Sequence, residues 1–228
     1  MTYIETWRLR LPKQTRIKSV VATLASVASL AYLLGSFPTG YIAGRLVGVD
    51  IRKVGSGNIG ATNVTRILGK RFGYLVFVVD LAKGLAAVAL ALIMAKAPRS
   101  SAQFVDLCAA TGAIFSVIGH SYSIWLGFRG GKGVATSIGA LFGISWITAV
   151  IVCVVWIVVF QATRYVSLAS MAAAIALPIT VAIMLFLKEM DTPIPLYFAF
   201  CLATIVVVRH RSNLSRLRKG TEPRFARK

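Results

Sequence analysis

Long runs of apolar residues, separated by short polar connections, dominate the chain. Several of these runs reach the roughly 20 residues that an α-helix needs to cross a bilayer. Inside hydrocarbon the backbone must satisfy its own hydrogen bonds, so the runs are either helices or strands of a closed barrel. They are continuously apolar, without alternation of polar and apolar positions, which excludes a barrel. The pattern predicts an all-α, polytopic integral membrane protein.

The apolar runs also give the positions of the predicted spans. We expect spans at about 19–44, 72–95, 104–126, 165–187 and 196–208. The first should be bent or loosened at Pro38, because proline removes a helical hydrogen bond. The uncharged run 134–160 is ambiguous, because as one helix it would extend about 40 Å across a hydrocarbon core of ~30 Å. It is either one tilted span or two helices that break near Gly143-Ile144-Ser145.

Composition changes the range of possible partners. The chain has 228 residues, of which 14% are charged, and its net charge is +19. In a soluble protein this charge would indicate nucleic-acid binding. In a membrane protein, basic loops set the topology and contact anionic lipid, so we expect membrane lipid and no nucleic acid as a partner. The distribution of Lys and Arg favours neither six nor seven spans strongly.

Cysteine and carboxylate positions give no support for a disulfide or a metal site. The three cysteines, Cys108, Cys153 and Cys201, all lie inside apolar runs. An odd number with none in a polar connection argues against a disulfide framework, and no spacing resembles a zinc site. We therefore expect no metal and no cofactor.

Two glycine-rich polar turns lie between the apolar runs. The first is the stretch Gly55-Ser56-Gly57-Asn58-Ile59-Gly60-Ala61-Thr62-Asn63, and the second is Gly130-Gly131-Lys132-Gly133. Glycine turns bind phosphate because the backbone can approach closely and direct its N–H groups at oxygens, while a nearby Lys or Arg supplies charge. Alternatively, the glycines only form tight turns between helices. Two such stretches, each with a basic residue, favour the binding of phosphorylated substrates.

Familiar motifs for phosphate or acyl chemistry do not fit these stretches. A Walker A loop would need glycine at Leu126 and Ser or Thr at Gly133, so nucleotide hydrolysis has no support. The His-x4-Asp motif of one type of lysophospholipid acyltransferase would need Asp at Trp125 or Ser215. Neither histidine of the chain satisfies that spacing.

Several polar residues lie within or at the ends of the spans. Asp80 and Lys83 are three residues apart on one helix face, and we interpret them as a structural pair that faces the bundle. His120 lies at a span end, where a structural histidine is the commoner case. His210 and Asn213 point the same way if the last span continues as a helix.

Three ordered signatures resemble those of the bacterial acyl-phosphate:glycerol-3-phosphate acyltransferases. The first runs from Val49 through the first glycine turn and Arg66 to Gly69, the second from Gly119 to Thr136, and the third from His210 to Leu217. Order, spacing and apolar surroundings agree over residues 20–220. Ser212 stands where an acidic residue is often found in the family, and residues 1–18 are not part of the resemblance.

The resemblance implies a seven-helix enzyme of the bacterial cytoplasmic (inner) membrane, with the N-terminus outside and the signatures at the cytoplasmic face. Residues 134–160 must then form two helices. A basic extension (1–18) would precede the transmembrane acyltransferase domain (19–210), and a basic cytoplasmic tail (211–228) would follow it. Residues 1–18 would lie outside, where their basic charge is unfavourable to this topology.

The resemblance also implies a reaction. A fatty acyl group passes from acyl phosphate to the 1-hydroxyl of sn-glycerol 3-phosphate, which gives lysophosphatidic acid and inorganic phosphate. This is the first committed acylation of phospholipid synthesis. The enzyme that makes acyl phosphate is then an expected partner. Two functions of other classes stay open, a transporter of phosphorylated metabolites that binds them near broken helices and a non-catalytic lipid-binding scaffold.

By the same resemblance, the catalytic residues are Ser56, Arg66, Lys132, His210 and Asn213. The expected substrate-binding residues belong to the two glycine turns, and they are Gly55, Gly57, Asn58, Thr62, Asn63, Gly130, Gly131 and Gly133. We expect direct acyl transfer in preference to an acyl-Ser56 intermediate, because both histidines lie far from Ser56 in the sequence.

Overall fold

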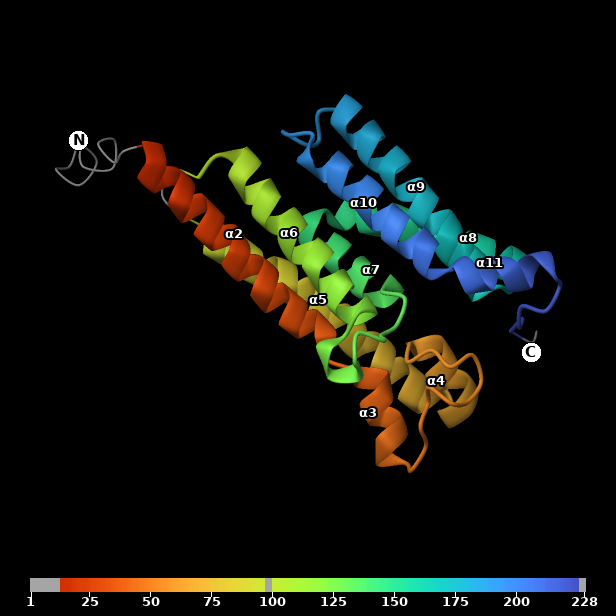
Figure 1. The fold of residues 1–228 in the computed structure, drawn as a ribbon. Helices are drawn as coiled ribbons and strands as arrows, with labels where there is room; N and C mark the ends of the chain where they lie inside the picture. Colours follow the sequence, from red (N-terminus) through yellow and green to blue (C-terminus); the bar gives the residue numbers. More distant parts are fainter. Residues whose placement is uncertain (1–12, 97–99, 226–228) are drawn as a thin grey trace.

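The computed structural model describes residues 13–96 and 100–225, and every regular element within these ranges is helical (Figure 1). The first half contains α2 (Lys13–Ser36), α3 (Thr39–Leu46), α4 (Ala61–Leu68), α5 (Lys70–Ala95), α6 (Ala102–Ser121) and the short 3-10 helix η1 (Ile124–Leu126). The second half contains α7 (Val134–Ile144), α8 (Trp146–Thr163), α9 (Val166–Phe186), α10 (Ile194–Arg209) and α11 (Arg211–Arg218). The all-α prediction is confirmed.

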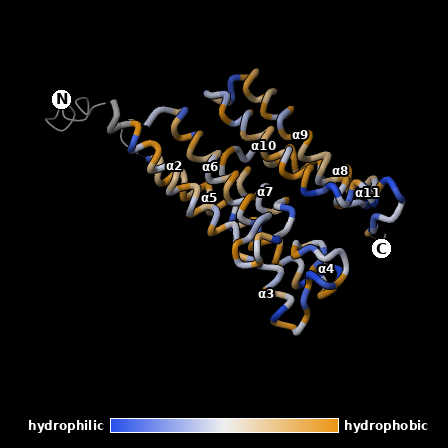
Figure 2. The backbone as a smooth tube through the Cα atoms, in the orientation of Figure 1, coloured by the Kyte–Doolittle hydropathy of each residue, from blue (hydrophilic) through white to orange (hydrophobic). Residues whose placement is uncertain are grey.

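Five segments of the described chain are long and apolar enough to cross a membrane. They are Ile17–Leu46, Lys70–Ala95, Ala102–Leu126, Trp146–Thr163 and Val166–Phe186. A sixth is present if α10 and α11, which meet at an angle of 54°, are counted as one bent span. Hydrophobic residues follow these long helices, while hydrophilic stretches gather around α11 and at the ends of the helices (Figure 2). The chain is therefore a multi-pass integral membrane protein.

The structure also locates the predicted breaks. The run 134–160 divides at Ser145, whose extended backbone (φ −154°, ψ 104°) separates α7 from α8. The Ser145 hydroxyl caps α8 by accepting a hydrogen bond from the Thr148 N–H at 3.3 Å, which is the usual role of serine at a helix start. The first span breaks as expected beside Pro38, between α2 and α3.

The first helix begins earlier than the sequence pattern indicated. We expected the first span from about residue 19, whereas α2 begins at Lys13, inside the predicted basic extension. Residues 1–12 of that extension lie outside the described residues. The last span was expected at 196–208 and corresponds to α10, which is longer by two residues at its start and one at its end.

Glycines let neighbouring helices approach to backbone contact. A Cβ on Gly84 of α5 would lie 2.0 Å from the Thr136 carbonyl oxygen, and one on Gly139 of α7 would lie 1.9 Å from that of Leu81. Close backbone approach through small residues is typical of membrane helices, because lipid provides little hydrophobic driving force for their association. These contacts fix α7, which begins beside Lys132, against α5.

Asp80 and Lys83 form the predicted buried pair within the bundle. The Lys83 ammonium lies 2.9 Å from Asp80 Oδ1, and it also donates to the Phe37 carbonyl oxygen at 3.0 Å. The Thr39 hydroxyl donates to the same carboxylate oxygen at 3.1 Å. The pair therefore provides hydrogen-bond partners for the chain on both sides of Pro38, where α2 gives way to α3.

Candidate active site

Three segments that are distant in the sequence meet around one polar hollow. They are the first glycine turn before α4, the second glycine turn before α7, and the junction of α10 and α11 (Figure 1). The hollow is open, with a volume of about 390 Å³. Its lining residues are Ser56, Gly57, Asn58, Tyr122, Gly130, Lys132, Val208, Arg209, Arg211 and Ser212. The structure thus brings the three signature segments together.

Asn63 organises the first glycine turn from within. Its side chain is 1% exposed, and its Oδ1 accepts a hydrogen bond from the Ser56 N–H at 2.9 Å. Its Nδ2 donates to the carbonyl oxygens of Ile51 (3.2 Å) and Val54 (3.1 Å). We expected Asn63 to bind substrate, but its amide is fully engaged in holding the loop that presents Ser56 to the hollow.

Several amides of the first turn are hydrogen-bonded inside the turn. Besides the Ser56 N–H, the Gly57 N–H donates to the Val54 carbonyl oxygen at 3.1 Å. Gly57 has a φ of 69°, which favours glycine over residues with a Cβ. The Asn58 side chain lines the hollow, and its Oδ1 accepts a long hydrogen bond of 3.4 Å from the Gly60 N–H. The side chains of Ser56 and Asn58 and the backbone of Gly57 line the hollow here.

The second glycine turn packs directly on the end of α6. The Gly130 N–H donates to the Ser121 carbonyl oxygen at 3.1 Å, and the Gly131 N–H donates to that of His120 at 3.0 Å. A Cβ on Gly130 would lie 2.0 Å from the His120 carbonyl oxygen, and one on Gly131 would lie 2.2 Å from His120 Nε2. These glycines therefore permit close packing on His120, and their amides do not face the hollow. Lys132 supplies the positive charge of this turn.

A chain of hydrogen bonds links Lys132 to the C-terminal segment. The Lys132 ammonium donates to Asn213 Oδ1, and Asn213 Nδ2 donates to Glu222 Oε1 at 2.6 Å. Ser167 Oγ donates to the same carboxylate oxygen at 2.6 Å, and Arg216 Nε donates to Glu222 Oε2 at 2.7 Å. The carboxylate of Glu222 therefore fixes the Asn213 amide in the orientation that presents its oxygen to Lys132.

Sequence reasoning missed Glu222. Glu222 is the single acidic residue of the segment 209–228, which has eight basic residues, and an acid in such surroundings was a signal for a buried ion pair. Its side chain is 5% exposed. Burial alone would raise the pKa of Glu222, but hydrogen bonds from Ser167, Asn213 and Arg216 outweigh burial and hold the pKa below its usual value.

The surroundings of Lys132 lower the affinity of its amine for a proton. Burial, as the largest cause, lowers the pKa of Lys132 to about 8. The positive charges of Arg216, Arg209 and Arg66 lower it further, and the negative charge of Glu222 opposes them. Positive charge is thus concentrated around Lys132, which is favourable for binding an anion such as phosphate.

His210 and Arg66 do not line the hollow but lie among the same group of segments. His210 Nδ1 lies 2.7 Å from the Val206 carbonyl oxygen, which can only accept, so Nδ1 carries a proton and the Nε2 of the neutral ring is an acceptor. Arg66 Nη2 donates to the Pro223 carbonyl oxygen at 3.2 Å, and its guanidinium lies 4.9 Å from the centre of the Phe225 ring. Arg66 therefore connects α4 to the C-terminal segment.

The remaining predicted residues occupy supporting positions. Thr62 is half-buried on α4, and Gly133 precedes α7 with a φ of 79°. Gly55 has a φ of 59°, and a Cβ there would lie 2.3 Å from Asn63 Oδ1. Gly55, Thr62, Gly131 and Gly133 are not among the lining residues of the hollow. They shape the two turns around it.

The sequence matches the glycerol-3-phosphate acyltransferase family over residues 25–220. The chain belongs to this family. The family resemblance inferred from the three signatures is therefore confirmed, and the family match extends over all three of them. The hollow and the segments around it are the candidate active site of a glycerol-3-phosphate acyltransferase.

Close relatives cover nearly the whole chain. The glycerol-3-phosphate acyltransferase of Synechococcus elongatus is 44% identical over 211 residues, which are 92% of this chain and 98% of that protein. The protein of the same name from Aquifex aeolicus is 44% identical over 196 residues, which are 86% of this chain and 95% of that protein.

Two crystal structures share the fold of this acyltransferase. Both are of PlsY (YgiH), an integral membrane glycerol 3-phosphate acyltransferase. The glycerol 3-phosphate form has a TM-score of 0.78 at 39% identity and covers 89% of this chain and 96% of that chain. The lysophosphatidic acid form has a TM-score of 0.75 at 38% identity and covers 89% and 95%, respectively.

The role assigned to Glu222 can be tested with Glu222→Gln. The substitution replaces one carboxylate oxygen by an amide nitrogen, which cannot accept hydrogen bonds. A buried donor of Ser167, Asn213 or Arg216 then loses its acceptor, and we expect a loss of about 1.5–3 kcal/mol of stability. Thermal unfolding in detergent would measure the loss. Glu189→Gln, at an exposed position, is the matched control, and equal unfolding temperatures for the two variants would contradict the assignment.

Proposed function

We propose that this acyltransferase transfers a fatty acyl group from acyl phosphate to the 1-hydroxyl of sn-glycerol 3-phosphate, giving lysophosphatidic acid and inorganic phosphate. The observation that carries the proposal is the contact between Lys132 and Asn213 at the point where the three signature segments meet. The named ligands of the two PlsY structures, glycerol 3-phosphate and lysophosphatidic acid, support the acceptor and the product. Acyl phosphate as the donor rests on the signature resemblance.

The polar hollow is suited to the phosphate groups of both substrates. Lys132, Arg209 and Arg211 line it, and Ser56 and Asn58 add neutral hydrogen-bonding groups. Charge-assisted hydrogen bonds from such side chains bind phosphate more strongly than neutral groups do. His210 and Asn213 would orient the glycerol end, and Arg66 would add positive charge from behind the first turn.

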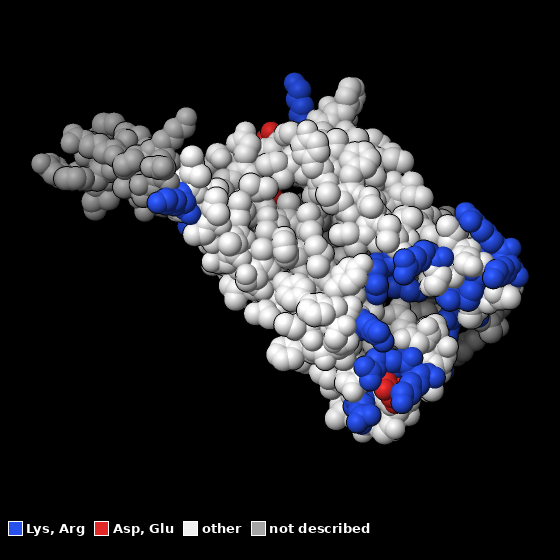
Figure 3. All heavy atoms as spheres, in the orientation of Figure 1, with Lys and Arg blue, Asp and Glu red and all other residues white. Residues whose placement is uncertain are grey.

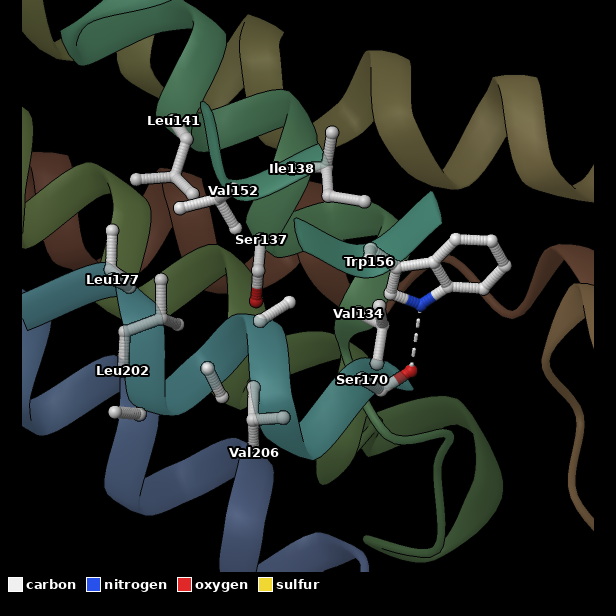
Figure 4. A pocket seen from close by; sticks show the side chains of 13 residues that line it. Val134, Ser137, Ile138, Leu141, Val152, Trp156, Ser170, Leu177, Leu202 and Val206 are labelled. Carbon is white, nitrogen blue, oxygen red and sulfur yellow. Dashed lines mark hydrogen bonds between the residues drawn. The ribbon is translucent and has the colours of Figure 1, made fainter. Parts of the chain in front are cut away.

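A narrow apolar cavity next to the hollow is the place that we assign to the start of the acyl chain. It lies between α7, α8, α9 and α10, and residues such as Leu141, Leu177 and Leu202 line it (Figure 4). Its internal space is only about 30 Å³, so an acyl chain that enters must displace some of these side chains. Val134, two residues after Lys132, also lines it, so the cavity begins beside the candidate site. An acyl chain placed there would bring its carbonyl group towards Lys132.

The reaction needs little covalent help from the protein. The 1-hydroxyl oxygen attacks the acyl carbonyl carbon, the bond from that carbon to the phosphate oxygen breaks, and phosphate leaves. The hydroxyl proton passes to an oxygen of the leaving phosphate. The enzyme must then orient the substrates and stabilise the developing negative charge, and Lys132 is placed to do both.

Direct transfer is preferred over an acyl-Ser56 intermediate. A serine nucleophile usually needs a general base within hydrogen-bond reach. In the described part of the chain, the Ser56 hydroxyl has no hydrogen bond to either histidine, and His210 directs Nδ1 to its own helix. We therefore assign Ser56 the role of a hydrogen-bonding group for the reacting atoms.

The arrangement of charge supports a cytoplasmic site. Lys and Arg side chains gather at the end of the molecule where α3, α4 and α11 lie, and the middle of the face in Figure 3 is almost free of them. The positive-inside rule assigns such an end to the cytoplasm. We propose seven membrane helices, with α7 and α8 counted separately and the N-terminus outside, in the bacterial cytoplasmic membrane.

The proposed reaction can be tested with purified protein and acyl phosphate that carries a labelled acyl chain. With glycerol 3-phosphate present, we expect labelled lysophosphatidic acid and free phosphate in equal amounts. Without glycerol 3-phosphate, we expect no label on the protein. Labelled protein would instead support an acyl-Ser56 intermediate, and counterflow of unchanged glycerol 3-phosphate in proteoliposomes without product would support a transporter.

Substitution of Lys132 tests the site within the same assay. We expect Lys132→Ala to lower kcat by about 100-fold or more, because one preorganised charged donor at the developing oxyanion is lost. The exposed residue Lys70 gives the matched control, Lys70→Ala. Full activity of a folded Lys132→Ala variant would rule out the assigned role.

The lowered pKa of Lys132 predicts a pH dependence. The residue binds phosphate only when protonated, so kcat/KM should fall as the pH rises through about 8. Lys132→Arg should move this decline to a higher pH, whatever its effect on the maximal rate, because a guanidinium stays protonated throughout the range. Initial rates between pH 6 and pH 10, at subsaturating glycerol 3-phosphate, provide the measurement. An identical decline in both proteins would contradict the assignment.

The apolar cavity predicts an effect on chain length. Ala174→Phe would fill part of the cavity, and we expect the ratio of kcat/KM for short over long acyl chains to rise about tenfold. The neighbouring Ile175 is 57% exposed, so Ile175→Phe is a control on the outer face of the same helix. Competition between two acyl phosphates of different length would measure the ratio. An unchanged ratio in Ala174→Phe would place the acyl chain elsewhere.

A further inference from the structure

Arg209 binds the carbonyl side of the second glycine turn. Its Nη2 donates to the carbonyl oxygens of Gly130 (3.1 Å) and Gly131 (2.9 Å), and its Nε donates to Gly131 at 3.2 Å. Two adjacent nitrogens of one planar guanidinium therefore engage two successive carbonyl groups. This geometry needs the fixed fork of arginine, which the single ammonium of lysine does not have.

The opposite side of the same turn is bound by α6. The N–H groups of Gly130 and Gly131 donate to the carbonyl oxygens of Ser121 and His120. The turn is thus held between the last turn of α6 and the last residue of α10. Lys132 is the next residue, so the position of its ammonium depends on how firmly this turn is held.

A further contact fixes Arg209 itself. Its guanidinium carbon lies 4.9 Å from the centre of the Tyr122 ring, and cation–π attraction at this distance favours one orientation of the guanidinium. Tyr122 follows directly after α6, so this contact joins α10 to the same helix end that holds the amides of the turn. The guanidinium lies against an aromatic ring and also binds the backbone of the turn.

We propose that Arg209 is a positioning residue, which holds the Gly130–Gly131 turn so that Lys132 stays directed at Asn213 and the reacting phosphate. The proposal rests on the proposed role of Lys132. It also explains how a phosphate group can bind beside this turn, because two exposed carbonyl dipoles would repel an anion. Because the Arg209 guanidinium binds both carbonyl oxygens, their partial negative charge is paired with a positive charge.

The test must separate the shape of the Arg209 side chain from its charge. Arg209→Lys keeps the charge and loses the fork, whereas Arg209→Gln loses both. Since misplacement of a reacting group by about 1 Å can cost about 100-fold in rate, we expect kcat of Arg209→Lys to fall about 100-fold while KM for glycerol 3-phosphate changes less than about threefold. Arg209→Gln should show the same fall in kcat and a higher KM. Arg71→Lys and Arg71→Gln, at an exposed position, are the matched controls.

A chemical rescue keeps the test decisive if the lysine variant folds poorly. In Arg209→Ala, added methylguanidinium should restore kcat at least about tenfold, because it can reoccupy the fork, and methylammonium should not. Near-normal kcat in Arg209→Lys, or equal rescue by the two cations, would overturn the proposal, and so would the absence of rescue by methylguanidinium. An inactive unsubstituted enzyme would count against the proposed function instead, so the two failures are distinguishable.

Discussion

The buried pair of Asp80 and Lys83 connects the chain break of the first span to the rest of the bundle. In a membrane-spanning segment, a carbonyl or hydroxyl freed from a helix must find a partner within the protein. Lys83 provides one for Phe37, and Asp80 provides one for Thr39. The bend that these bonds stabilise directs α3 away from α2 and starts the polar connection that ends in the first glycine turn. One ion pair on α5 therefore determines where that turn leaves the membrane helices.

The same face of α5 also supports the second turn. Gly84 lies one residue after Lys83, and its lack of a side chain lets α7 approach to backbone contact at Thr136. His120 Nδ1 lies 3.7 Å from Asp80 Oδ1, while Nε2 of the same ring faces Gly131. The imidazole therefore lies between the buried carboxylate and the glycine turn. The structural role that we expected for His120 is consistent with this position, and it extends to the support of the turn that carries Lys132.

Local patterns in the sequence predicted the parts of this architecture that depend on local physics. Apolar runs gave the helices, Ser145 marked the break before α8, and the spacing of Asp80 and Lys83 gave the buried pair. Local patterns did not predict the contacts between segments that are distant in the sequence. Ser167 and Glu222 are 55 residues apart, and only the packing of the C-terminal segment on α9 brings them together. The signatures indicated that Lys132 and Asn213 share a site, but nothing in them indicated the acid that orients the amide.

The glycine turns show how a correct motif can carry an incomplete physical explanation. Their residues suggested that free amides bind phosphate, yet several of these amides are hydrogen-bonded within the protein, and the glycines of the second turn are needed because α6 lies so close. In the proposed function, anion binding then depends mainly on side-chain charge. Arg216, Arg209 and Arg66 act electrostatically on Lys132, and the carboxylate of Glu222 opposes them. Burial first, and these cations second, lower the affinity of Lys132 for its proton, and the proposed binding of phosphate would oppose this effect. If Lys132 binds phosphate as proposed, each bound phosphate adds negative charge beside the ammonium and favours its protonated form. Substrate binding and the charge state of Lys132 are then coupled.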